Sequence, residues 1–113
     1  MSARSHISTH VLDAVSGQPA TGVAVALHGF GGDLWRLLAE GVTDADGRLA
    51  DLGPAVLTPG RYRVVFDTGG YFARTQTPTL YPEVLVSLEL TEPAHVHVPL
   101  LLSPFAYSTY RGS

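Results

Sequence analysis

A repeated alternation of apolar and polar residues constrains this chain more than any other feature. Side chains that alternate at every second position point to opposite faces of a β-strand. The pattern recurs along the whole chain, in residues 6–13, 23–28, 61–67, 83–90 and 95–102. Gly and Pro separate these segments, and both residues favour turns. We therefore predict an all-β fold, a two-sheet antiparallel β-sandwich of eight short strands.

Residues 33–42 form the segment whose secondary structure is most ambiguous. Leu34, Leu37 and Leu38 have the spacing of one helical turn. The segment is short and stops at Gly41, however, and a helix of this length is marginal by itself. Because strands are predicted on both sides of it, we predict a strand here as well.

The remaining segments are predicted to form turns, short strands and one short helix. Turn-forming residues cluster at 16–19 and at 43–47. We expect a short strand over residues 49–52, a single helical turn over residues 71–76 and a last strand over residues 105–110. The last strand would form a hairpin with the alternating segment that precedes it.

Length and charge limit the kinds of function that we expect. The chain has 113 residues, which fits a single domain over residues 1–113. Its net charge of −3, with only 15% charged residues, does not provide the basic surface that nucleic acids and anionic membranes attract. The 45% of hydrophobic residues favours an apolar surface and hence oligomerisation.

Cysteine is absent from the chain. This excludes a disulfide framework, a thiol nucleophile and a thiolate metal site. Residues 1–5 lead into a polar strand without an apolar signal segment, and no run of about 18 apolar residues occurs later. The sequence therefore predicts a cytoplasmic protein.

Two histidines lie two residues apart in the last long alternating segment. In a strand, His95 and His97 share one face with Pro99, and their imidazoles would lie roughly 6–7 Å apart. His10 shares a face of the first strand with Ser8. A strand histidine is more often structural than functional, and terminal residues are often loosely held. These residues alone therefore do not assign a function.

Several separated motifs together carry a resemblance to a known family. They are residues 9–13 (THVLD), 17–20 (GQPA), 46–48 (DGR), 97–100 (HVPL) and 110–113 (YRGS). In this order they resemble the transthyretin-related 5-hydroxyisourate hydrolases, and the match extends over about residues 8–113. The His-Val-Leu-Asp motif alone is weakly specific. The tetrapeptide at residues 110–113, together with two histidines and an arginine, is highly specific.

The resemblance implies a transthyretin-like sandwich with a short helix after its fifth strand. It also implies a homotetramer, a dimer of dimers, with paired active sites where the dimers meet. The implied reaction is a step of urate degradation, the opening of 5-hydroxyisourate to 2-oxo-4-hydroxy-4-carboxy-5-ureidoimidazoline. The implied partner is thus a small-molecule substrate, and such a hydrolase needs no cofactor or metal.

The resemblance also implies roles for individual residues: catalysis by His10, Arg48 and His97, and substrate binding by Tyr110, Arg111 and Ser113. Histidine titrates near neutrality, so it can take a proton from water or deliver one to a leaving nitrogen. The arginine fork stays charged and suits a planar, oxygen-rich ligand. Which histidine is the base stays open. Because a loose tail could not orient a substrate, we expect residues 110–113 to be ordered by packing against another subunit.

Three alternatives stay open at this point. The first is a transthyretin-type module that binds a small aromatic ligand or hormone without catalysis, although transthyretins have a lysine at the position matching His10 and lack the tetrapeptide at residues 110–113. The second is a zinc hydrolase that uses His10, His95 and His97 as ligands. The third is a purely structural sandwich domain. In the favoured hypothesis His95 is a supporting or surface residue, and no function is assigned to His6, His28 and Trp35.

Overall fold

Nine strands and one short helix make up the computed structural model, which describes residues 4–113. The first three residues of the domain predicted over residues 1–113 lie outside this description. The strands are β1 (Ile7–Asp13), β2 (Gln18–Pro19), β3 (Ala24–Gly31), β4 (Leu34–Val42), β5 (Arg48–Leu49), β6 (Gly60–Phe66), β7 (Val84–Leu90), β8 (Val96–Ser103) and β9 (Ala106–Thr109). The helix α1 (Thr68–Ala73) lies between β6 and β7.

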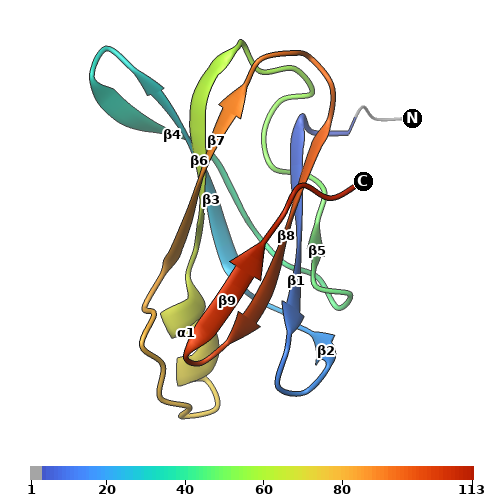
Figure 1. The fold of residues 1–113 in the computed structure, drawn as a ribbon, viewed down its shortest axis with the longest axis vertical. Coiled ribbons are helices and arrows are strands. Elements are labelled where there is room, and N and C mark those ends of the chain that lie inside the picture. The colour runs from blue at the N-terminus through green and yellow to red at the C-terminus, as the bar shows by residue number, and fades with distance from the viewer. Residues whose placement is uncertain (1–3) are drawn as a thin grey trace.

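The strands form two sheets that face each other as the layers of a sandwich (Figure 1). One sheet has the order β2–β1–β8–β9, with β5 also paired to β1, and the other has the order β4–β3–β6–β7. The predicted β-sandwich is confirmed. It departs from the antiparallel expectation in one place, because β1 and β8 pair in parallel while the other described strand pairs are antiparallel.

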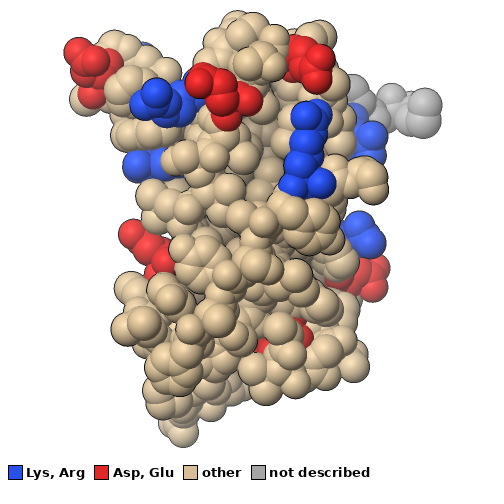
Figure 2. Space-filling view, in the orientation of Figure 1, with Lys and Arg blue, Asp and Glu red and all other residues tan. Residues whose placement is uncertain are grey.

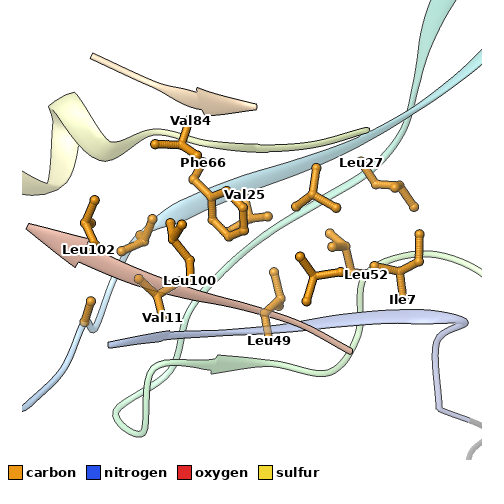
Figure 3. Packing of buried hydrophobic residues seen from close by; sticks show 14 of the residues in the cluster. Ile7, Val11, Val25, Leu27, Leu49, Leu52, Phe66, Val84, Leu100 and Leu102 are labelled. Atoms are coloured by element: carbon orange, nitrogen blue, oxygen red, sulfur yellow. The ribbon is translucent and has the colours of Figure 1, made fainter. Parts of the chain in front are cut away.

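The hydrophobic core lies between the two sheets (Figure 3). Phe66 and Val84 of one sheet approach Val11 and Leu100 of the other, and all four side chains are at most 1% exposed. Each such burial contributes about 1.5–3 kcal/mol relative to an exposed side chain. Since alternate residues of β1, β3, β6, β7 and β8 enter this core, the residues between them must face outward.

Two elements differ from the sequence prediction for local reasons. Gln18–Pro19, expected to be part of a turn, pairs with the end of β1 and adds a ninth strand. The helix begins at Thr68, three residues before the predicted start, because the Asp67 side chain caps the amide of Gly70 at 3.0 Å. The helix therefore follows the sixth strand rather than the fifth.

The ambiguous segment is a strand, as predicted. β4 pairs along its length with β3, and together they extend as a hairpin away from the rest of the sandwich (Figure 1). Leu34 and Leu37, which suggested a helical turn, are 60% and 54% exposed on this hairpin. No helix within residues 4–113 has the length and hydropathy needed to cross a membrane.

Candidate active site

Three strands bring the predicted catalytic residues together on the outer face of the five-stranded sheet. β5 pairs with β1 so that Arg48 lies opposite His10. β8 pairs with β1 so that His97 lies opposite Ser8. Most of the residues that alternate with these four in their strands belong to the buried core, namely Ile7, Val11, Leu49 and Val98. His10, Arg48 and His97 therefore project from one outer surface, although they are far apart in the sequence.

Arg48 is positioned by a tight turn directly before β5. The backbone amides of Asp46 and Arg48 both donate to Asp44 Oδ1 at 2.9 Å, and the Asp44 amide donates to the Arg48 carbonyl at 2.9 Å. Gly47 has a φ of +73°, and a Cβ at this position would collide with the carbonyl oxygen of Val11. The Asp-Gly-Arg motif therefore fixes the backbone from which the exposed Arg48 side chain extends.

His10 and His97 lie beside each other, with ring centroids 6.5 Å apart. A hollow of about 160 Å³ opens next to His97. Its lining consists of Arg4, Ser8, Thr9, Arg48, Leu49, Ala50, His95, His97 and Ser113. The hollow thus presents two guanidinium groups and two imidazoles, which suits a small, oxygen-rich ligand that accepts hydrogen bonds.

Ser8 links the two histidines of the last alternating segment. Its hydroxyl oxygen lies 2.9 Å from His95 Nε2 and 2.8 Å from His97 Nδ1. His95 Nδ1 in turn lies 2.8 Å from the carbonyl oxygen of Ser5. Both ring nitrogens of His95 are therefore engaged in hydrogen bonds within the protein, and its supporting role stays a prediction.

The same contacts bear on the zinc alternative. With both nitrogens hydrogen-bonded, His95 has no lone pair left for a metal ion. Within residues 4–113, no group of three or more His, Cys, Asp or Glu side chains is placed to hold a metal. The three-histidine arrangement that this alternative requires is not formed in this geometry.

The surroundings of His97 favour its neutral form. Burial lowers the pKa of His97 below its ordinary value, and the positive charge of Arg48 lowers it further. His10, His95 and Arg4 add smaller effects in the same direction. Because even an ordinary imidazole, with a pKa of about 6.5, is mostly unprotonated at pH 7, His97 is neutral there. A neutral imidazole can accept a proton.

Replacing Arg48 with methionine is expected to raise the pKa of His97. The substitution removes a positive charge that disfavours the imidazolium form, so His97 binds its proton at a higher pH. An NMR titration of the His97 ring in the free protein measures this shift. Added salt should reduce the difference, because the charge of Arg48 is exposed and therefore screened.

Arg36→Met is the matched control for this titration, because Arg36 is also exposed but lies on β4 of the other sheet. It should leave the pKa of His97 unchanged. A pKa that stays constant or falls in the Arg48→Met protein would contradict the electrostatic role of Arg48.

The chain returns to β8 after the end of β9. The Gly112 amide donates to the His97 carbonyl at 2.8 Å, and the two residues form an isolated antiparallel bridge. Ser113 then lines the hollow together with Arg48 and His97. The tail is therefore tethered by its own chain, and its ordering by another subunit stays a prediction.

Tyr110 and Arg111 lie in a different place from Ser113. They line a groove of about 300 Å³ between β7 and the β8–β9 pair, and His97 lines this groove as well. Both side chains are exposed. The structure therefore brings Ser113 to the hollow that holds Arg48, while Tyr110 and Arg111 occupy a neighbouring groove that meets the hollow at His97.

Comparison with known proteins identifies the family of this chain. The profile described as HIUase/Transthyretin family matches residues 7–112. The chain belongs to this family. The 5-hydroxyisourate hydrolase of Salmonella dublin is 46% identical over 109 residues, which cover 95% of this chain and 80% of the relative. Klebsiella pneumoniae 5-hydroxyisourate hydrolase superposes with a TM-score of 0.86 at 39% identity, covering 95% of this chain and 98% of that structure.

The HIUase/Transthyretin family also includes a binding protein of the same shape. Sea bream transthyretin in complex with thyroxine superposes with a TM-score of 0.84 at 33% identity, covering 94% of this chain and 93% of that structure. The backbone alone therefore does not distinguish a hydrolase from a thyroxine-binding protein. The side chains of the hollow must do so.

Asp13, the last residue of the THVLD motif, has a structural role. Its Oδ1 accepts hydrogen bonds from the amides of Val15 and Ser16, and its Oδ2 accepts one from the Tyr71 hydroxyl at 2.9 Å. Burial and the hydrogen bond to Asp13 raise the pKa of Tyr71 to about 12. Asp13 therefore joins the end of β1 to the helix and takes no place in the hollow.

The histidine near the start of β1 is structural as well. His6 is 1% exposed, and its Nδ1 accepts a hydrogen bond from the Leu57 amide at 2.8 Å. Ser8 and Arg4 also line the hollow, and neither was among the predicted site residues.

Proposed function

We propose that this chain is a 5-hydroxyisourate hydrolase, which opens its substrate to 2-oxo-4-hydroxy-4-carboxy-5-ureidoimidazoline in urate degradation. The proposal rests above all on the hollow in which the cation of Arg48 lies close to a neutral His97. A base and an electrostatic stabiliser are thereby within reach of one small molecule. The Salmonella dublin relative that bears the name of this activity is 46% identical, against 33% for sea bream transthyretin.

In this mechanism His97 is the general base. A water molecule attacks a ring carbonyl carbon of the substrate while its proton passes to the unprotonated Nε2 of His97. The lowered pKa of His97 keeps this nitrogen available at neutral pH. The alternative is that His10 is the base, and the variants His97→Asn and His10→Asn distinguish the two assignments.

Arg48 stabilises the charge that develops on the carbonyl oxygen. Its guanidinium is always protonated and offers several donors in one plane. Hydrogen-bond donors aimed at a developing oxyanion stabilise the transition state, and this stabilisation is usually the largest single contribution to the rate enhancement. When the tetrahedral intermediate collapses, the carbon–nitrogen bond breaks and the ring nitrogen receives a proton. His10, with its ring centroid 6.5 Å from that of His97, is the group that we propose to assist this transfer.

Residues of the tail complete the proposed substrate site. Ser113 lines the same hollow as Arg48 and can hydrogen-bond the substrate ring at its rim. Tyr110 and Arg111 line the adjacent groove, which His97 also lines. We propose that all three orient the substrate, with Ser113 making the most direct contact.

We also propose that the chain assembles as a homotetramer, a dimer of dimers. β7 and β9 are edge strands of their sheets, and exposed edges pair readily with another copy. Few charged side chains lie on the surface over β9, whereas they gather toward the upper part of the same view (Figure 2). Phe105 and Tyr107 are 66% and 42% exposed in this region. A single domain over residues 1–113 and a cytoplasmic location stay predictions.

The alternative function is binding of a small aromatic ligand without catalysis. The likeness to sea bream transthyretin, which was solved in complex with thyroxine, supports it. The hydrolase is favoured because His10 and residues 110–113 match the hydrolase pattern and not that of the transthyretins. The two functions make opposite predictions for turnover.

Ultraviolet absorbance of freshly generated 5-hydroxyisourate tests the proposal directly. We expect its decay to be much faster with the purified protein than without it, and a chelator should leave the rate unchanged. An absence of acceleration, from protein shown to be folded and tetrameric, would favour the binding function. Chelator-sensitive activity that zinc restores would favour the metal alternative.

A further inference from the structure

The hydroxyl of Ser8 occupies a position between two imidazoles that the proposed mechanism does not yet use. Ser8 is 6% exposed and lies opposite His97 in the parallel β1–β8 ladder. Its oxygen lies within hydrogen-bond distance of His95 Nε2 and of His97 Nδ1, at 2.9 and 2.8 Å. A hydroxyl has one proton, so it can donate to one of these rings and must accept from the other.

The backbone at Ser5 decides in which direction this chain of hydrogen bonds runs. His95 Nδ1 lies 2.8 Å from the Ser5 carbonyl oxygen, which can only accept, so Nδ1 of His95 carries a proton. Ser5 itself is anchored, because its hydroxyl donates to the Gly53 carbonyl and accepts from the Leu52 amide, both at 2.8 Å. The acceptor at this end is therefore fixed in place.

A neutral His95 with its proton on Nδ1 has a lone pair on Nε2. That lone pair accepts the Ser8 proton, and the Ser8 oxygen then accepts a proton from Nδ1 of His97. A neutral His97 with its proton on Nδ1 has its lone pair on Nε2. The sequence of donors and acceptors therefore ends in an unprotonated nitrogen at His97.

We propose that Ser8 and His95 are positioning residues that hold His97 in the tautomer with the proton on Nδ1 and the lone pair on Nε2. This inference rests on the proposed function, because only the Nε2 lone pair can accept the proton of the attacking water. It adds two residues to the reaction, and both act through the orientation of the His97 ring. The tautomer is set from the backbone carbonyl of Ser5, through two side chains.

The opposite direction would require a second proton on His95. Its Nε2 would then donate to Ser8, the hydroxyl would donate to Nδ1 of His97, and Nε2 of His97 would carry a proton. That state places an additional positive charge beside Arg4 and Arg48. The described residues that line this hollow include no Asp or Glu to balance it. The direction on which the proposal depends adds no such charge to the hollow.

The tautomer of His97 can be measured without any turnover. Long-range proton–nitrogen NMR correlations of the wild-type protein at neutral pH distinguish a protonated ring nitrogen from one with a lone pair. We expect a protonated Nδ1 in both His95 and His97, and a lone pair on Nε2 of His97. A proton on Nε2 of His97 would overturn the inference, whether or not the protein is active.

Kinetics of Ser8 variants test the consequence for catalysis. Ser8→Ala removes the hydroxyl, so we expect kcat to fall by about 10–100-fold, the range seen when a group that orients a metal-bound histidine is lost. KM and the melting temperature should change little. Ser8→Thr keeps the hydroxyl and should restore most of kcat, which a merely structural role of Ser8 would not predict.

His95→Phe should also disturb the tautomer of His97. It removes the acceptor for the Ser8 proton, so the hydroxyl is free to donate to His97 and to favour the wrong tautomer. The double variant Ser8→Ala/His95→Phe should be no less active than the less active of the two single variants, because both substitutions interrupt the same chain of hydrogen bonds. If the wild-type protein is active and Ser8→Ala has the same kcat, the inference is refuted but the proposed function is not. An inactive wild type would refute the proposed function, and the NMR result would still decide the tautomer.

Discussion

Replacing His97 with asparagine is expected to lower kcat by about 10²–10⁴-fold, the share of catalysis that a positioned general base supplies. Asparagine keeps a polar side chain of similar reach but cannot take a proton from water near neutral pH. His97 is only partly buried on the outer face of β8, so the fold should persist. The decay of 5-hydroxyisourate under saturating conditions measures kcat, and the melting temperature checks the fold.

His28→Asn is the matched control, because His28 also lies partly buried on a strand, but in the other sheet. His6 is unsuitable as a control, since its ring is buried and accepts a hydrogen bond from the Leu57 amide. His10→Asn should lower kcat as well, but by less than His97→Asn if His97 is the base. A larger loss in His10→Asn would reverse the assignment of the two histidines.

Most of the fold was predictable because strand periodicity is a local property. The alternation of residues 61–67 puts Tyr62, Val64 and Phe66 on one face of β6, and all three are buried. The two-residue strand at Gln18–Pro19 was not predictable, because its residues are typical of turns and only the neighbouring end of β1 pairs with them. The start of the helix depended on the Asp67 cap, which the predicted range of residues 71–76 overlooked.

The predicted site was incomplete because strand register is a property of the whole fold. The alternation already placed Ser8 on the face of His10, which was a usable signal. Its contacts with His95 and His97, however, cross 87 and 89 residues of sequence. They depend on the parallel pairing of β1 with β8, which no local pattern predicts. The sequence likewise did not predict that Ser113 lines the hollow while Tyr110 and Arg111 line the neighbouring groove.

Replacing Gly112 with alanine is expected to lower the activity strongly while the protein stays folded. A Cβ at this position would lie 2.6 Å from His97 Cδ2 and 3.0 Å from Pro99 Cγ, closer than carbon atoms pack. The ring of His97 is held by Ser8, and Pro99 is buried. The tail or the ring must therefore move, and a displacement of about 1 Å in an active site can cost about 10²-fold in rate.

Gly31→Ala is the matched control for this substitution. A Cβ at Gly31 meets no atom within 4 Å, and the residue lies at the end of β3, in the other sheet. Its activity should equal that of the wild type. Comparable rates for Gly112→Ala and Gly31→Ala would show that the close approach of the tail to β8 is irrelevant to turnover.

Removing residues 111–113 distinguishes the two ways in which Gly112→Ala can act. The truncation relieves any pressure on the His97 ring but takes Ser113 out of the hollow. Since the hydrophobic core contains no residue after Leu102, the truncated protein should fold, with a loss of about 1 kcal/mol from the hydrogen bond between Gly112 and His97. We expect it to lose most of its activity, as Gly112→Ala does. An active truncated protein together with an inactive Gly112→Ala would mean that alanine acts by displacing the base, and that the tail itself does not bind the substrate.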